Sequence, residues 1–156
     1  MNKCLPIIAL LLMPIFLNAE TIEGKVVGVS DGDTITVLLV TESAKTSVKI
    51  RLSEIDTPER NQAFGTQAKQ QLSKKIFGKI VTVEYQGKDR YGRIVGKIYL
   101  GKRWINKEMV AEGFAWHYKQ YSKDKELAKA ETKSRVKRLG LWIDKDPMPP
   151  WKFRQQ

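Results

Sequence analysis

The stretch Ile50-Arg51-Leu52-Ser53-Glu54-Ile55-Asp56-Thr57-Pro58-Glu59 sets the organisation of the whole chain. It begins with the alternation of a β-strand, because Val48, Ile50 and Leu52 share one face while Arg51 belongs to the other. It ends in a turn, because Pro58 holds the preceding residue extended and has no N–H to donate. The stretch therefore predicts a guanidinium on the polar face of a strand and carboxylates at the strand's end. A cation beside hard oxygen ligands suits a phosphate together with a divalent metal.

The segments on either side predict a small barrel of short strands. Residues 21–29 and 33–41 are rich in β-branched residues, and short polar turns separate them from each other and from 46–55. In the first turn, Asp31-Gly32-Asp33, Gly32 is free to adopt a positive φ. Two further strands are expected at 79–86 and 94–100.

Helical patterns follow the third strand and the fifth. We expect a helix over 66–77 capped by Thr66, another over 104–112 ended by Gly113, and a last one capped by Ser122 and stopped by Gly140. Five strands with a helix after the third, then two more helices, is the order of an OB-type barrel. The predicted fold class is therefore α+β, a five-stranded OB-fold barrel with three α-helices, and such barrels commonly bind nucleic acid.

The chain divides into three parts. Residues 1–19 read as a signal peptide, with Lys3 before an apolar run and Ala19 at the end, although an uncleaved anchor or a buried strand are the alternatives. Residues 20–145 form one domain, and 146–156, with three prolines, are expected to be an irregular tail. The lone cysteine, Cys4, precedes the domain, so a packed core has to replace disulfides. This organisation predicts an exported protein, periplasmic or secreted.

The charge balance points to a polyanionic partner. The formal net charge of +11 falls to +10 when Lys3 is removed with the leader. Nucleic acid is the first expectation and an anionic membrane surface the second. The sequence has no long helix with one apolar face, which argues against stable membrane association after cleavage.

Four segments carry candidate chemistry, although each alone has a plain structural interpretation. Asp31-Gly32-Asp33-Thr34 is most often a simple turn, and it is not a calcium-binding EF-hand loop because Ile35 and Thr36 replace the acid and glycine required there. Arg51 alone is most often a solvated strand residue. Asp56-Thr57-Pro58-Glu59 alone suits a helix-capping turn, and Asp89-Arg90-Tyr91-Gly92-Arg93 alone suits a hairpin tip.

Together and in this order, these segments closely resemble the thermonuclease, or staphylococcal nuclease-like, family. The resemblance runs from about Val26 to Trp142, and weaker matches are Val110–Ala115 and Leu139–Trp142. It implies an OB-fold barrel and a monomeric, calcium-dependent nuclease. Such an enzyme cleaves DNA and RNA, prefers single strands, and leaves 3′-phosphate and 5′-hydroxyl ends. One departure is a loop after Glu59 that is shorter than in the best-known member; another is the diverging segment after Ala115.

The resemblance also implies a role for individual residues. Asp33 and Asp56 are expected to bind Ca²⁺ through their carboxylates, with the carbonyl of Thr57. Glu59 is expected to take the proton of the attacking water, while Arg51 and Arg93 hold the scissile phosphate. Tyr91 is expected to line the nucleotide pocket.

Residue chemistry agrees with these roles and adds a binding surface. Guanidinium groups suit a phosphate whose negative charge grows in the transition state. Arg90 can follow the backbone of a single strand, and Tyr118 can stack on a base, as can Tyr121 and Trp116 unless they are packing residues. Two carboxylates alone do not separate Ca²⁺ from Mg²⁺. His117, the only histidine, is expected to be a surface or pocket-edge residue. The alternatives to the enzyme are a catalytically inactive nucleic-acid-binding OB module and a basic protein that binds membrane or envelope polymers.

Overall fold

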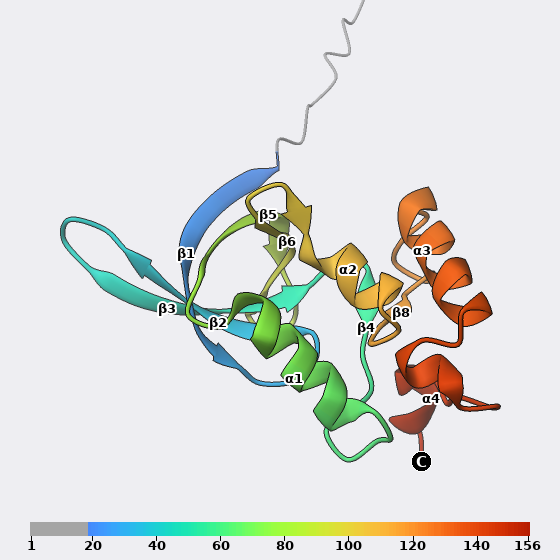
Figure 1. The fold of residues 1–156 in the computed structure, drawn as a ribbon. Coiled ribbons are helices and arrows are strands. Elements are labelled where there is room, and N and C mark those ends of the chain that lie inside the picture. The colour runs from blue at the N-terminus through green and yellow to red at the C-terminus, as the bar shows by residue number, and fades with distance from the viewer. Residues whose placement is uncertain (1–18) are drawn as a thin grey trace, which may run out of the picture.

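The computed structural model describes residues 19–156, so nearly all of the predicted signal peptide lies outside the described residues. Five strands form the barrel: β1 (Glu20–Val29), β2 (Thr34–Val40), β3 (Lys45–Leu52), β5 (Ile80–Lys88) and β6 (Ile94–Leu100) (Figure 1). Antiparallel pairs join them in the order β3-β2-β1-β5-β6, and a parallel pairing of β3 with β6, centred on Arg51 opposite Val95, closes the barrel. The predicted five-stranded barrel is confirmed.

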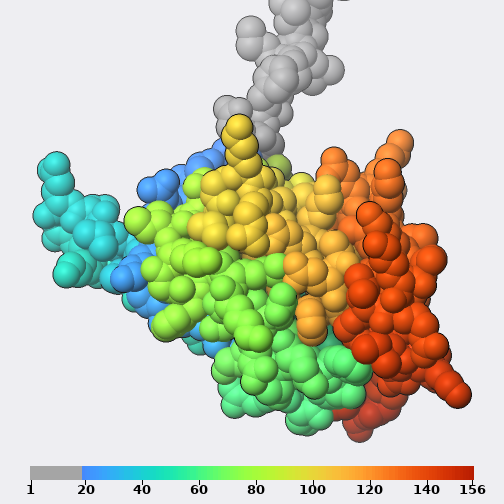
Figure 2. Space-filling view, in the orientation of Figure 1, coloured from blue at the N-terminus to red at the C-terminus, as the bar shows by residue number. Residues whose placement is uncertain are grey.

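Three short strands complete the β-structure. β7 (Arg103–Trp104) continues the sheet beyond β6. β4 (Ile55–Asp56) pairs with β8 (Trp116–His117) in a separate two-stranded sheet. The tip of the hairpin between β2 and β3 projects away from the body of the molecule (Figure 2).

The three predicted helices are present as α1 (Gly65–Ile76), α2 (Ile105–Ala111) and α3 (Lys125–Val136). Two predicted caps are wrong. The cap of α3 is Asp124, whose carboxylate accepts hydrogen bonds from the N–H groups of Glu126 and Leu127, whereas Ser122 donates its hydroxyl to Glu54. α1 begins after Phe64, which has a φ of 67° and offers no side-chain cap, so Thr66 lies inside the helix. Gly140 does not stop α3 but starts a 3₁₀ helix, η1 (Gly140–Ile143).

The core fills the barrel and the space beneath the helices. Fully buried aliphatic side chains from β2, β3, α1, β6 and α2 meet there, among them Ile35, Ile50, Leu72, Ile98 and Met109. Trp116, Leu141 and Trp142 form a second buried cluster, and the guanidinium of Arg135 in α3 lies 3.9 Å from the centroid of the Trp142 ring. Trp116 is therefore a packing residue and not a base-stacking one.

The segment expected to be an irregular tail is partly ordered. Residues 146–149 contain no helix or strand, but Pro150–Phe153 form a short helix, α4. Proline suits the first turn of a helix because the N–H it lacks has no intrahelical partner there. The ring of Trp151 in α4 stacks on Tyr118 with centroids 5.2 Å apart and planes 5° apart. Aromatic packing thus fixes a segment whose local sequence gives no sign of order.

None of the helices within residues 19–156 has the length and apolar character needed to cross a membrane.

Candidate active site

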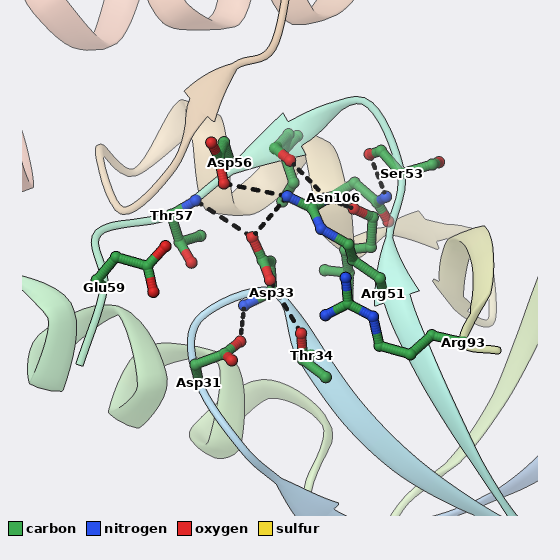
Figure 3. A network of polar contacts seen from close by, with 12 residues as sticks. Asp31, Asp33, Thr34, Arg51, Ser53, Asp56, Thr57, Glu59, Arg93 and Asn106 are labelled. Carbon is green, nitrogen blue, oxygen red and sulfur yellow. Dashed lines mark hydrogen bonds and ion pairs between the residues drawn. The ribbon is translucent and has the colours of Figure 1, made fainter. Parts of the chain in front are cut away.

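The centre of the site is an arginine placed between two buried carboxylates (Figure 3). The pairing of β2 with β3 sets Thr34 opposite Arg51, so Asp33 at the start of β2 lies next to the arginine. Arg51 Nη2 is 3.0 Å from Asp56 Oδ1 and 3.3 Å from Asp33 Oδ2. Only 1% of the Asp56 side chain is exposed, so this ion pair is largely desolvated.

Arg51 is held by the backbone as well as by the acids. Its Nη1 donates to the carbonyl oxygens of Leu52 at 3.0 Å and Ile55 at 3.1 Å. These contacts occupy one side of the guanidinium and leave 17% of the side chain exposed toward the cavity. The planar guanidinium has five N–H donors, and because part of it is fixed in this way, its remaining donors point in a defined direction.

The turn before β2 brings the Asp33 carboxylate against residues 57–64, which we call the Glu59 loop. Asp33 Oδ2 accepts the backbone N–H of Thr57 at 3.3 Å, and Asp33 Oδ1 accepts the Thr34 hydroxyl at 3.0 Å. Asp31 accepts the backbone N–H of Asp33. Burial, together with the charge of Asp33, raises the pKa of Asp31 to about 6.

Gly32 does not use the positive φ that its turn position allows. A Cβ at this position would instead lie 2.8 Å from both Thr57 Oγ1 and the Ala68 Cβ. Glycine is needed here because the turn packs closely against the Glu59 loop and α1, and not because of its backbone angles.

The charged loop between β5 and β6 supplies the second guanidinium. Asp89 accepts the backbone N–H groups of Tyr91 and Arg93 and pairs with Arg93 Nε at 2.8 Å. These bonds lower the pKa of Asp89 against the effect of burial. Gly92, with a φ of 77°, makes the tight turn possible. The Arg93 side chain extends toward Arg51 and Asp33 (Figure 3).

Glu59 lies on the loop that follows β4, and its carboxylate meets a residue that the sequence did not indicate. Arg154, which directly follows α4, donates to Glu59 Oε1 at 2.6 Å and to Asp56 Oδ2 at 2.7 Å. Burial raises the pKa of Asp56, and the hydrogen bond from Arg154 opposes that rise. The pKa of Arg154 rises because these two carboxylates favour its charged form.

All of the residues predicted for the site line one cavity of about 770 Å³. They are Asp33, Arg51, Asp56, Thr57, Glu59, Arg90, Tyr91, Arg93 and Tyr118. Tyr121 and Arg154 line it too, whereas His117, which was expected at the surface or the pocket edge, is 3% exposed and packed inside. Sequence reasoning missed Arg154 because its segment was interpreted as an irregular tail.

The donor set suits a hard divalent cation. Among residues 19–156, no three side chains of the His, Cys, Asp and Glu types cluster as a complete metal site. Asp33 and Asp56 nevertheless lie close enough that the charge of Asp33 raises the pKa of Asp56. Two buried carboxylates that repel each other are stabilised by a bound cation. Oxygen donors completed by a backbone carbonyl and water are the ligands that Ca²⁺ and Mg²⁺ take.

A closed barrel whose carboxylates and guanidinium groups face one cavity is the architecture of a phosphate-processing enzyme. Comparison with known proteins identifies the family of this enzyme. The family described as "Staphylococcal nuclease homologue" matches residues 49–144. The chain is 43% identical to an "Uncharacterized endonuclease" of Haemophilus influenzae, over 99% of this chain and 87% of the relative. It is 40% identical to an "Uncharacterized endonuclease" of Escherichia coli, over 100% and 99% of the two chains. A "Micrococcal nuclease" of Shigella flexneri is 40% identical over 85% and 80%. The chain belongs to the staphylococcal nuclease family.

Proposed function

We propose that this protein is a calcium-dependent nuclease that hydrolyses phosphodiester bonds of DNA and RNA and leaves 3′-phosphate and 5′-hydroxyl ends. The observation that carries the proposal is the convergence of Asp33, Arg51, Asp56, Glu59 and Arg93 on one cavity. Family membership supports the nuclease activity itself. Calcium and the identity of the product ends are proposed on the family resemblance.

Each group has a task that its position allows. Arg51 and Arg93 bind the scissile phosphate, and they neutralise the charge that builds on its oxygens in the transition state. Arg93 uses Nε for Asp89, so its two terminal nitrogens remain for phosphate oxygens. Glu59 accepts the proton of the attacking water through Oε2, which receives no hydrogen bond from any described residue.

Asp33, Asp56 and the carbonyl of Thr57 would hold the cation. When bound, it supplies positive charge that polarises the phosphate and lowers the pKa of nearby water. Asp56 has capacity for this role although it pairs with Arg51 and Arg154, because a carboxylate offers about four acceptor positions. The donor set alone does not separate Ca²⁺ from Mg²⁺, and calcium is proposed because of the family resemblance.

The cavity walls suit a single strand. Tyr91 is 67% exposed, and Tyr118 and Tyr121 line the same cavity, so bases from an unpaired strand can stack there. Arg90 lies beside Tyr91 and donates to its hydroxyl at 2.7 Å, within reach of the strand's phosphates. We propose single-stranded DNA and RNA as preferred substrates, a monomeric enzyme, and export to the periplasm or the medium with no stable membrane association.

A digestion assay tests the proposal. Single-stranded DNA, duplex DNA and RNA are incubated with Ca²⁺, with Mg²⁺ or with EGTA, and product ends are identified by whether polynucleotide kinase labels them without prior phosphatase treatment. We expect cleavage with Ca²⁺, faster on single strands, and direct labelling of new 5′-hydroxyl ends. Activity that persists in EGTA would contradict the calcium assignment. Equal DNA binding by wild type and Glu59→Gln, with no cleavage by either, would support the inactive module.

A further inference from the structure

Arg154 joins Asp56, at the end of β4, to Glu59, on the loop that follows β4. Besides its short contacts, Arg154 Nη1 lies 3.3 Å from Asp56 Oδ1, so one planar guanidinium spans both oxygens of Asp56 and one oxygen of Glu59. Arg154 is 95 residues from Glu59 along the chain. A planar fork held on two carboxylates fixes their mutual orientation more strictly than a point charge can.

A second link ties the backbone of the same loop to the same segment. The side-chain carbonyl of Gln62 accepts the backbone N–H of Glu59 at 3.0 Å. The amide nitrogen of Gln62 donates to the Met148 carbonyl at 2.6 Å. Both the main chain and the side chain of Glu59 are therefore connected to residues 147–156, which we call the C-terminal clamp.

The C-terminal clamp is anchored well enough to act as a support. Trp151 stacks on Tyr118 and meets the edge of Trp116 at 5.5 Å between ring centroids. Aromatic pairs of this geometry contribute to stability beyond the area that they bury. Pro150, at the start of α4, is buried. Arg154 is thus presented from a packed helix and not from a free chain end.

The loop that carries Glu59 needs such support. Residues 57–64 form no helix or strand, and 38% of the Glu59 side chain is exposed. Among the described residues, the carboxylate of Glu59 receives hydrogen bonds from Arg154 alone. Without that contact the side chain would move among several rotamers, since nothing else holds it.

We propose that Arg154 is a positioning residue for the reaction: it holds Oε1 of Glu59 beside Asp56 and leaves Oε2 directed to the attacking water. The proposal rests on the proposed function, in which Glu59 takes the proton. The contribution of Arg154 is geometric, because misplacing a reacting group by about 1 Å can cost about 10²-fold in rate. Arg154 then belongs to the active site, although it lies outside the matched family region of residues 49–144.

The test compares Arg154→Gln with Lys152→Gln, which removes the same charge from an exposed position of α4 that forms no ion pair within the described residues. Rates are measured with single-stranded DNA at saturating Ca²⁺, and hydrogen exchange is followed in peptides covering 57–65 without metal or DNA. For Arg154→Gln we expect kcat to fall about 10- to 100-fold, KM to change little, and the loop to exchange faster. Lys152→Gln should match the wild type in both measurements.

Two further variants separate positioning from folding. Arg154→Lys should recover part of the lost kcat, since it keeps the charge but not the fork. Arg154→Ala should regain activity in guanidinium at concentrations well below those that unfold the protein, while sodium at equal ionic strength should not help. An unchanged kcat with unchanged loop exchange would overturn the proposal, and a raised kcat would mean that Arg154 obstructs the site. If the wild type cuts nothing, the proposed function fails, while loop exchange still decides whether Arg154 holds the Glu59 loop.

Discussion

Replacing Arg51 by lysine keeps the positive charge at the centre of the site but removes the planar fork. Arg51 makes four contacts, to the carbonyls of Leu52 and Ile55 and to the carboxylates of Asp33 and Asp56, all between 3.0 and 3.3 Å. A lysine ammonium reaches part of this set but not all of it, because its donors radiate from one atom. The substitution therefore separates the effect of charge from that of geometry.

The expected losses follow from those contacts. Losing the two bonds to backbone carbonyls should lower the free energy of unfolding by about 2 kcal/mol, since bonds from charged donors in part-buried sites contribute on the order of 1.5–3 kcal/mol each and lysine restores part. Losing a donor aimed at the transition-state phosphate should lower kcat/KM by about 10²- to 10³-fold. The activity loss should thus exceed what partial unfolding can explain.

Two measurements check this prediction. Initial rates on single-stranded DNA in Ca²⁺ give kcat/KM, and urea unfolding in EGTA gives stability without the contribution of bound metal. The control is Arg103→Lys, because Arg103 pairs with Glu108 and 49% of its side chain is exposed. That control should change stability by less than about 1 kcal/mol and leave activity unaltered. An Arg51→Lys enzyme within about tenfold of the wild type would refute the idea that the fork of Arg51 acts in the reaction.

Two other predictions concern the supports of the site. Gly32→Ala should lower the free energy of unfolding in urea by about 1–3 kcal/mol, because the new methyl overlaps Thr57. Gly87→Ala, where a Cβ meets nothing within 4 Å, should be nearly neutral. Equal effects of the two substitutions would contradict the packing explanation. Burial lowers the pKa of His117, with Glu131 opposing and Lys119 reinforcing the shift, so the unfolded chain binds the proton more readily. The contribution of His117 to stability should therefore fall as the pH drops below 6.5, the ordinary value for histidine, and His117→Leu should remove this contribution from the profile measured by thermal unfolding.

The barrel and the centre of the site could be predicted because their signals are local. Strand alternation around Ile50 and Leu52 placed Arg51 on the face opposite the core, and the structure puts it at the cavity. Backbone pairing then brings Asp33 to Arg51 without further information, since the register of β2 on β3 follows from the buried face of each strand. The signals for the helix positions were also local, but those for the helix caps were not. Asp124 displaced Ser122 at α3 because the Ser122 hydroxyl finds a partner in Glu54, distant in sequence.

The remaining features depend on tertiary contacts that leave no local trace. Gly32 looked like a turn glycine, but its requirement comes from the approach of Thr57. His117 looked exposed within a polar segment, but pairing of β8 with β4 buries it. Arg154 followed a proline-rich run that predicts irregular chain, and only the stacking of Trp151 on Tyr118 brings it to the cavity.

Backbone hydrogen bonds fix one part of the site, and contacts between side chains hold the other part in place. Asp33, Arg51 and Asp56 lie on or beside paired strands, so backbone hydrogen bonds fix them. Glu59 and Arg93 lie on loops, and each is anchored by one atom to an oppositely charged partner: Glu59 Oε1 to Arg154, and Arg93 Nε to Asp89. In both cases the anchor leaves the other polar atoms of the group available to substrate. The loops can therefore remain irregular while the atoms proposed to move a proton and hold a phosphate keep fixed positions. For this reason we expect substitutions of the two anchoring partners to change catalytic rate more than stability.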